Sequence, residues 1–246
     1  MNLDLTKNSA YIDKTPYEIW QETEGVPIYK ALAIDDLTTV AVGVWKRKGA
    51  SGAFINLLGA GRSCDSYLCE IPAQGHTLPE RYLFEELIYV VKGHGATSVW
   101  TEGGRKQTFE WQQGSMFSPP LNTWRQHFNV QGDEPARFVS LTDASVMINR
   151  FRNLDFIFNN SFEFSDRFSG EEGYFSGKGR AVESHRTWDS NFIPNVPGFK
   201  LIDHSARGQG AVSCCISRRT PSALTSKNIR WELIRGPIGM DRALTS

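Results

Sequence analysis

The chain has few cysteines, no long apolar run and no excess of either charge. Its 246 residues include four cysteines, whose spacing matches neither a zinc motif nor a disulfide framework. Buried packing as reduced thiols is therefore the expected role of Cys64, Cys69, Cys214 and Cys215. Lys+Arg and Asp+Glu both total 27, so no charge imbalance favours nucleic acid or an anionic membrane as a partner.

Two further absences concern location. No stretch approaches the roughly 20 apolar residues of a membrane-spanning helix, and the first seven residues lack the apolar region of a signal peptide. We therefore expect a cytoplasmic protein that does not bind membranes. Hydrophobic residues make up 40% of the chain and aromatic residues 12%, which is sufficient for a packed core.

The sequence does contain a series of short β-type segments separated by glycine. Glu102-Gly103-Gly104-Arg105 predicts a hairpin and Gly93-His94-Gly95 a turn, while Thr15 as cap and Pro16 as first residue predict a short helix over Tyr17–Gln21. Such spacing is typical of an all-β barrel or sandwich. The predicted strands are Leu37–Trp45, Ala53–Leu58, Ser66–Ile71, Glu86–Val91, Ala96–Thr101, Lys106–Trp111, Ser115–Ser118, Arg125–Val130 and Ala136–Thr142.

The pattern changes after Asp143. Phe156–Phe164 is aromatic and rich in asparagine, and Ser165–Ser190 is dense in Gly, Ser, Glu and Arg, which predicts an irregular arm. We therefore divide the chain into an N-terminal helix with leading strands (1–62), a barrel core (63–145) and a C-terminal arm (146–246).

Two spaced motifs carry a family resemblance. Glu86 and Gly93 have the spacing of a first motif, and Gly114, Pro120 and Asn129 fall in register with a second, in which Asn122 takes a Gly position and Arg125 a His position. The pair resembles the two motifs of the cupin superfamily, which implies a cupin (double-stranded β-helix, jelly-roll-like) barrel. The resemblance also implies a homodimer.

A narrower resemblance covers about Pro16 to Arg207. The stretches Gly93–Thr97, Thr101–Arg105 and Phe156–Asn160 are similar to the N-terminal half of the two-barrel cupins compared with gentisate dioxygenases. This resemblance implies a shortened, single-barrel relative.

The metal-ligand positions of the family map onto Glu80, Tyr82, Glu86 and Arg125. Only Glu86 matches by type, because Tyr82 is ordinarily a neutral phenol and Arg125 cannot ligate a metal. A guanidinium about 4 Å from a dication at an effective dielectric of 20 would be repelled by roughly 8 kcal/mol. We therefore expect no metal cofactor. The alternative is Fe(II) or another divalent metal held by His76, Glu80, Glu86 and His127.

Strand alternation indicates what fills the barrel instead: Glu80, Tyr82, Glu86, Arg125, His127 and Asn129. Tyr82 is the candidate acid, Glu86 or His127 the candidate base, and Arg125 a clamp for a substrate carboxylate or enolate. Candidate substrate-binding residues are Glu80, Trp100, Phe117, Trp124 and Asn129. A purely structural alternative pairs Arg125 with Glu86 or Glu80 and makes His127 a wall residue.

Three functions follow from these residues. The first is a metal-independent, single-barrel enzyme (isomerase, cyclase or lyase) that performs acid–base chemistry on a small organic molecule. The second is a metal-dependent, dioxygenase-like cupin with altered ligands. The third is a degenerate, non-catalytic cupin that binds a small molecule or a partner.

Overall fold

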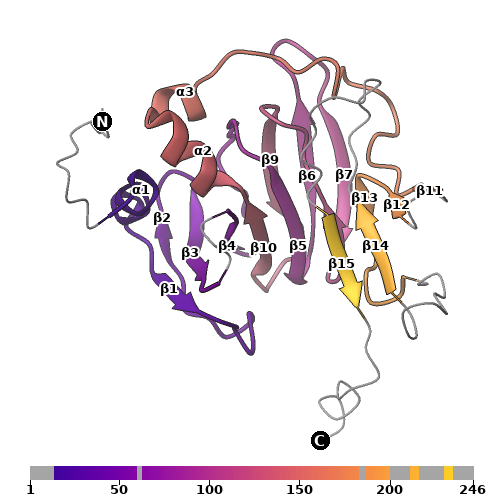
Figure 1. The fold of residues 1–246 in the computed structure, drawn as a ribbon. Coiled ribbons are helices and arrows are strands. Elements are labelled where there is room, and N and C mark those ends of the chain that lie inside the picture. The colour runs from indigo at the N-terminus through magenta and orange to yellow at the C-terminus, as the bar shows by residue number, and fades with distance from the viewer. Residues whose placement is uncertain (1–13, 60–62, 183–186, 200–210, 216–229, 235–246) are drawn as a thin grey trace, which may run out of the picture.

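A computed structural model describes residues 14–59, 63–182, 187–199, 211–215 and 230–234 (Figure 1). The described chain is mostly β-sheet, with one helix before the sheets and two after the main strands. The predicted all-β class, with a short N-terminal helix, is confirmed. No helix among the described residues is long and apolar enough to cross a membrane.

The largest sheet has the order β1-β3-β4-β10-β5-β8-β13, with β2 also pairing β3. A three-stranded sheet has the order β7-β6-β9, and a four-stranded sheet the order β11-β12-β14-β15. The large sheet consists of β1 (Ile28–Ala31), β2 (Gly43–Trp45), β3 (Ala50–Leu57), β4 (Asp65–Ile71), β5 (Glu86–Lys92), β8 (Met116–Phe117), β10 (Ala136–Thr142) and β13 (Phe192–Ile193). The others are β6 (His94–Trp100), β7 (Gln107–Gln112), β9 (Trp124–Asn129), β11 (Arg180–Val182), β12 (Thr187–Asp189), β14 (Ala211–Cys215) and β15 (Arg230–Ile234).

Helix α1 (Pro16–Glu24) begins where the sequence predicts. The Thr15 hydroxyl accepts from the Glu18 amide, and the Glu18 carboxylate accepts from the Thr15 amide in return, which forms a capping box. Gly25, at φ 71°, ends the helix in the left-handed conformation. The helix extends three residues beyond the predicted Gln21, and its buried Trp20 contacts Phe54 of the large sheet.

The core lies between the large sheet and the three-stranded sheet. Phe117 of β8 contacts Phe109 of β7, with ring centroids 5.0 Å apart, and Phe138 of β10 contacts His127 of β9 at the same distance. On β9, burial alternates strictly, so Arg125, His127 and Asn129 point into the core. The motif that contains Glu86 therefore lies on β5 of the large sheet. The motif from Gly114 to Asn129 spans β8 of that sheet and β9 of the facing three-stranded sheet.

Two segment predictions are wrong at their boundaries. Of Leu37–Trp45, only Gly43–Trp45 forms a strand, because Arg137 binds the carbonyls of residues 37, 38 and 40 at 3.1, 2.7 and 3.0 Å and holds them in a turn. The predicted turn at Gly93–Gly95 is also shorter. Strand β6 starts at His94, and Gly93 alone, at φ 92°, makes the bend.

The segment after Asp143 contains more structure than the sequence predicts. Helices α2 (Ala144–Phe151) and α3 (Leu154–Phe158) follow β10 directly, and β11 and β12 fall within the stretch that was expected to be irregular. The Tyr17 amide of α1 donates to Asn149 of α2 across 3.0 Å. The helices therefore lie together beside the sheet (Figure 1). His185 and His204, together with the side chains of Cys214 and Cys215, lie outside the described residues.

Candidate functional site

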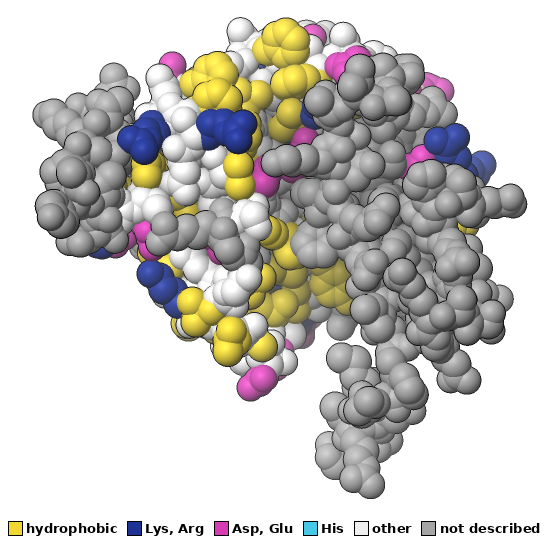
Figure 2. Space-filling view, viewed as in Figure 1, with side chains coloured by type: hydrophobic (Ala, Val, Ile, Leu, Met, Phe, Trp, Pro, Cys, Tyr) yellow, Lys and Arg dark blue, Asp and Glu magenta, His cyan; other side chains and the backbone are white. Residues whose placement is uncertain are grey.

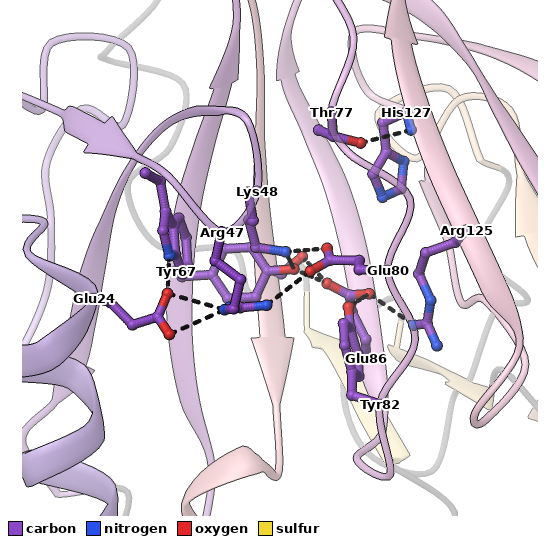
Figure 3. Close-up of polar contacts among 12 residues, drawn as sticks. Glu24, Arg47, Lys48, Tyr67, Thr77, Glu80, Tyr82, Glu86, Arg125 and His127 are labelled. Carbon is purple, nitrogen blue, oxygen red and sulfur yellow. Dashed lines mark hydrogen bonds and ion pairs between the residues drawn. The ribbon is translucent and has the colours of Figure 1, made fainter. Parts of the chain in front are cut away.

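Glu86, the first residue of β5, stands at the centre of the buried polar cluster (Figure 3). Its Oε1 accepts hydrogen bonds from the Tyr67 hydroxyl and from Ser140 Oγ, the latter at 2.6 Å. Its Oε2 accepts from the Tyr82 hydroxyl and, at 3.1 Å, from Arg125 Nη1. Four donors use the approximate full acceptor capacity of a carboxylate, so Glu86 has no lone pair left for a metal or a substrate proton.

Arg125 is fully buried and fixed on every side. Its side chain also donates to the Thr123 carbonyl at 3.3 Å and to the Pro120 carbonyl at 3.4 Å. The guanidinium carbon lies 4.1 Å from the centroid of the Tyr82 ring, a cation–π geometry. The predicted structural alternative, in which Arg125 pairs with an interior carboxylate, is therefore realised with Glu86 and not with Glu80.

Glu80 pairs with two other cations. It exchanges backbone hydrogen bonds with Arg125, yet its carboxylate accepts from Lys48 Nζ on one oxygen and from Arg47 Nη1, at 2.9 Å, on the other. Arg47 continues to Glu24 at the end of α1, through Nε bonds of 2.9 and 3.0 Å. Glu80 is thus buried, in a bridge with Arg125.

Tyr67 joins the two halves of this cluster. Lys48 Nζ donates to the Tyr67 hydroxyl at 3.1 Å, and that hydroxyl donates in turn to Glu86. A continuous chain of charged and hydroxyl groups therefore crosses the barrel from α1 to β9. The formal charges of its six ionic members cancel: Glu24, Glu80 and Glu86 against Arg47, Lys48 and Arg125.

The surroundings set the protonation of each acid. Burial alone would raise the pKa of Glu86, but the charges of Arg125 and Lys48 and the hydrogen bonds from Ser140 and Tyr67 outweigh it and hold that pKa at about 2. Burial would likewise raise the pKa of Glu80, and Lys48 and Arg47 lower it. Burial, reinforced by Glu86, raises the pKa of Tyr67 and Tyr82 well above 10. Both carboxylates are therefore ionised, and both phenols are neutral.

His127 differs from the other interior residues. Thr97 Oγ1 lies 2.8 Å from its Nδ1 and also accepts from Trp111 Nε1 at 2.9 Å. The simplest assignment makes Thr97 the donor to Nδ1 and places the imidazole proton on Nε2. Nε2 is buried without a hydrogen-bond partner in the described structure. Burial lowers the pKa of His127 to about 4, so its ring is neutral.

The remaining predicted residues do not join the cluster. Asn129 is buried, but its amide donates to the carbonyls of residues 71, 72 and 134 and its oxygen accepts from Gln131, which anchors loops. Phe117 is core. Trp100 and Trp124 pair across β6 and β9 one position out of phase with Arg125, so they lie on the outer face of that sheet, away from the cluster.

His76 also lies outside the buried polar cluster. It is exposed, bridges to Phe128, and packs against that ring with centroids 5.9 Å apart. Because Phe128 is on the outer face of β9 and His127 on the inner face, the alternative metal set does not assemble. Within the described ranges no group of three or more His, Cys, Asp or Glu side chains is arranged to hold a metal ion.

Sequence reasoning missed Arg47, Lys48, Tyr67 and Ser140. Arg47 and Lys48 follow the predicted strand Leu37–Trp45, and Tyr67 lies within the predicted strand Ser66–Ile71, but no motif singles them out. One signal was available: a single Arg125 cannot neutralise both Glu80 and Glu86, so a second interior cation was required. Of the two described cysteines, Cys69 is buried as expected, and burial raises the pKa of its thiol to about 12, whereas Cys64 is only partly buried.

A cavity of about 10 Å³ lies between α1 and the cluster, against Trp20, Trp45, Arg47, Lys48 and Tyr67. This volume is at the lower limit of what can hold one water molecule. The candidate catalytic side chains Tyr82, Glu86, Arg125 and His127 are each at most 1% exposed. A substrate would reach them only if the barrel opened.

No protein-family model and no curated protein matches the sequence. Solved structures of similar fold include the oxalate decarboxylase of Lactobacillus farciminis, with 19% identity over 45% of this chain and 34% of that one and a TM-score of 0.37. The Schizosaccharomyces pombe Cnp3 cupin domain is 17% identical over 48% of this chain and 77% of that one, with a TM-score of 0.37. An oxalate oxidase is 17% identical over 46% and 60%, with a TM-score of 0.39. Similarity at this level says nothing about the chemistry of this chain.

Proposed function

We propose that this chain is a non-catalytic member of the cupin superfamily, whose barrel interior is structural and whose function is to bind a ligand or partner on its outer surface. The observation that carries the proposal is the complete saturation of Glu86 by four donors, one of them Arg125. A carboxylate with a pKa of about 2 is a poor general base, and a phenol committed to that carboxylate is a poor acid.

Two fixed cations take the place of a divalent ion in this proposal. Lys48 and Arg125 together carry the charge of a dication, and each donates to one of the carboxylates at the positions where the family resemblance puts metal ligands. An added metal ion would have to displace both ammonium and guanidinium groups from buried partners. Under this proposal, purified protein contains less than about a tenth of an equivalent of Fe, Mn, Ni or Zn.

A second candidate is acid–base catalysis by His127, with a small organic molecule as substrate. The observation in its favour is the unpartnered Nε2 of a neutral, buried imidazole. Catalysis by His127 requires the barrel to admit a molecule, whereas the non-catalytic function does not. Access to His127 therefore separates the two.

The test is histidine modification of the native protein with diethyl pyrocarbonate, mapped by peptide mass spectrometry. His76 and His94 are exposed and serve as internal references, whereas His127 is 1% exposed. If the barrel interior is purely structural, we expect rapid modification of both reference histidines and protection of His127 until the protein unfolds. Modification of His127 at a rate close to that of His76 would reject the closed interior and favour the acid–base candidate.

A further inference from the structure

A groove of about 460 Å³ lies on the surface of α3 and the segment that follows it, outside the barrel. None of its residues belongs to the interior cluster. Its volume is in the usual range for small-molecule sites. The lining consists of Asn153, Asp155, Phe156, Asn159, Asn160, Ser161 and Phe162.

Two phenylalanines in this lining are exposed yet held in place. Phe156 is 40% exposed and Phe162 62%. Phe156 packs against Phe151 with ring centroids 4.9 Å apart, and Phe162 against Phe164 at 4.8 Å. Hydrophobic side chains gather at this end of the molecule, over α3 and the segment after it (Figure 2). The groove therefore presents aromatic surface that is already ordered before a ligand arrives.

Three polar side chains of the groove each use one of their two polar atoms in a local hydrogen bond. Asn153 Oδ1 accepts from the Phe156 amide at 2.9 Å, Asn160 Oδ1 from the Phe162 amide at 2.8 Å, and Asp155 Oδ1 from Asn159 Nδ2 at 2.7 Å. These bonds orient the side chains. The remaining polar atoms of these side chains have no hydrogen-bond partner among the described residues: Nδ2 of Asn153, Nδ2 of Asn160 and Oδ2 of Asp155. The groove thus offers two amide donors and a carboxylate acceptor.

Asn122 ties the groove to the barrel. It is 5% exposed, and its Nδ2 donates to the carbonyls of Asn160 at 3.0 Å and Phe162 at 2.8 Å. Its φ of 56° lies in the left-handed region, which asparagine tolerates better than most residues. This explains why asparagine stands where the second cupin motif has glycine: it keeps the backbone shape and adds an anchor. An anchored wall lowers the ordering cost of binding.

We propose that this groove binds a neutral saccharide of about two rings. Vicinal hydroxyls both donate and accept, which matches amide donors beside a carboxylate acceptor, while the apolar faces of sugar rings suit the exposed phenylalanines. Asp155 disfavours anionic ligands, and no cation lines the groove. The inference rests on the proposed function in that it locates the binding activity on the outer surface.

The test is a titration of the isotope-labelled, full-length protein with maltose, cellobiose or N,N′-diacetylchitobiose, followed by amide chemical shifts. We expect at least one disaccharide to give saturable shifts within residues 153–162. Phe162→Ala should weaken that binding roughly fivefold, about the value of one aromatic contact. Asn122→Gly, which keeps the backbone conformation but removes the anchor, should weaken it as well. Val130→Ala, at a residue 55% exposed outside the groove, is the matched control and should change nothing.

Two results would overturn the saccharide assignment: no shift at residues 153–162 with any of the three sugars, or shifts that Phe162→Ala leaves unchanged. Binding of triglycine at the same amides in place of the sugars would overturn it too, since that would indicate a peptide ligand. If the sugars fail while His127 remains protected from diethyl pyrocarbonate, the saccharide proposal is rejected and the structural interior stands.

Discussion

The Arg125 guanidinium lies over the ring of Tyr82, 4.1 Å from its centroid, and both side chains donate to the same oxygen of Glu86. In this arrangement the aromatic face of Tyr82 and the carboxylate of Glu86 together hold one arginine. It stabilises a buried positive charge that would otherwise carry a large desolvation penalty. Tyr82, Glu86 and Arg125 therefore form a unit in which each member depends on the others.

Arg125→Met tests this dependence. Methionine fills a similar volume but leaves Glu86 ionised and buried without its cation, so the free energy of unfolding should fall by about 3–5 kcal/mol. Chemical denaturation measures it. In a double-mutant cycle, Arg125→Met combined with Glu86→Gln should cost less than the sum of the single changes by more than about 1 kcal/mol. Strictly additive losses would show that the two side chains are not coupled.

Lys48→Met tests the second fixed cation. Lys48 is 2% exposed and donates to both Glu80 and Tyr67, so its loss leaves Glu80 with Arg47 alone and should lower the free energy of unfolding by about 2–4 kcal/mol. Lys46→Met, two residues away in the same turn but exposed, is the matched control and should stay within about 0.5 kcal/mol of the original. Equal effects of the two variants would place Lys48 outside the network.

The strand pattern and the two motifs were enough to predict the class of fold and the inward-facing set. Glu80, Tyr82, Glu86, Arg125, His127 and Asn129 are all buried. Alternation on β9 accounts for Arg125, His127 and Asn129, whereas Glu80 and Tyr82 lie before β5 and outside the named strands. The same rule applied to Trp124 would have placed it outside, one position from Arg125. It was grouped with the interior by residue type, which carries no information about the face.

The rest of the site depended on contacts between segments far apart in the chain. Lys48 reaches Glu80 and Tyr67 reaches Glu86 across 32 and 19 positions, and no local pattern reports such pairings. The loop at 37–42 was misread for a similar reason: its Val- and Thr-rich sequence favours a strand, but Arg137, about 100 positions away, binds its carbonyls. Tertiary contacts overrode the local preference.

The pH dependence of stability should reveal His127. Burial lowers the pKa of His127 to about 4, whereas the unfolded chain takes up the proton near pH 6.5. The unfolded state therefore binds more protons between these values, and stability should fall by about 3 kcal/mol as the pH drops from about 6.5 to about 4. His127→Gln should remove this contribution, so the difference in unfolding free energy between the original and the variant shrinks over that interval. A constant difference would contradict the shift.

Asp65 provides a control of opposite sign. Burial raises the pKa of Asp65 to about 6, so the folded state takes up this proton before the unfolded state does, and stability gains as the pH falls from about 6 to about 4. Asp65→Asn should therefore make the acid-side loss steeper, whereas His127→Gln makes it shallower. The loss linked to Glu86 belongs to a lower interval, from about pH 4.5 down to about 2, and should remain in both variants.

Gly52→Ala should disturb the packing of Trp45, which contacts the first carboxylate of the ionic chain, Glu24. A Cβ at Gly52 would lie 2.5 Å from Trp45 Cε3 and 2.6 Å from the Leu68 carbonyl oxygen, and Trp45 is fully buried. The indole must move, and its Nε1 donates to the same Glu24 carboxylate that pairs with Arg47. We expect a loss of about 2 kcal/mol by denaturation, with a change in near-ultraviolet circular dichroism. Gly132→Ala is the control, since its nearest contact is Gln74 Nε2 at 3.7 Å, and it should stay within about 0.5 kcal/mol. If Gly52→Ala were equally neutral, Trp45 would not be confined against β3, and the link from α1 into the barrel would be looser than its contacts imply.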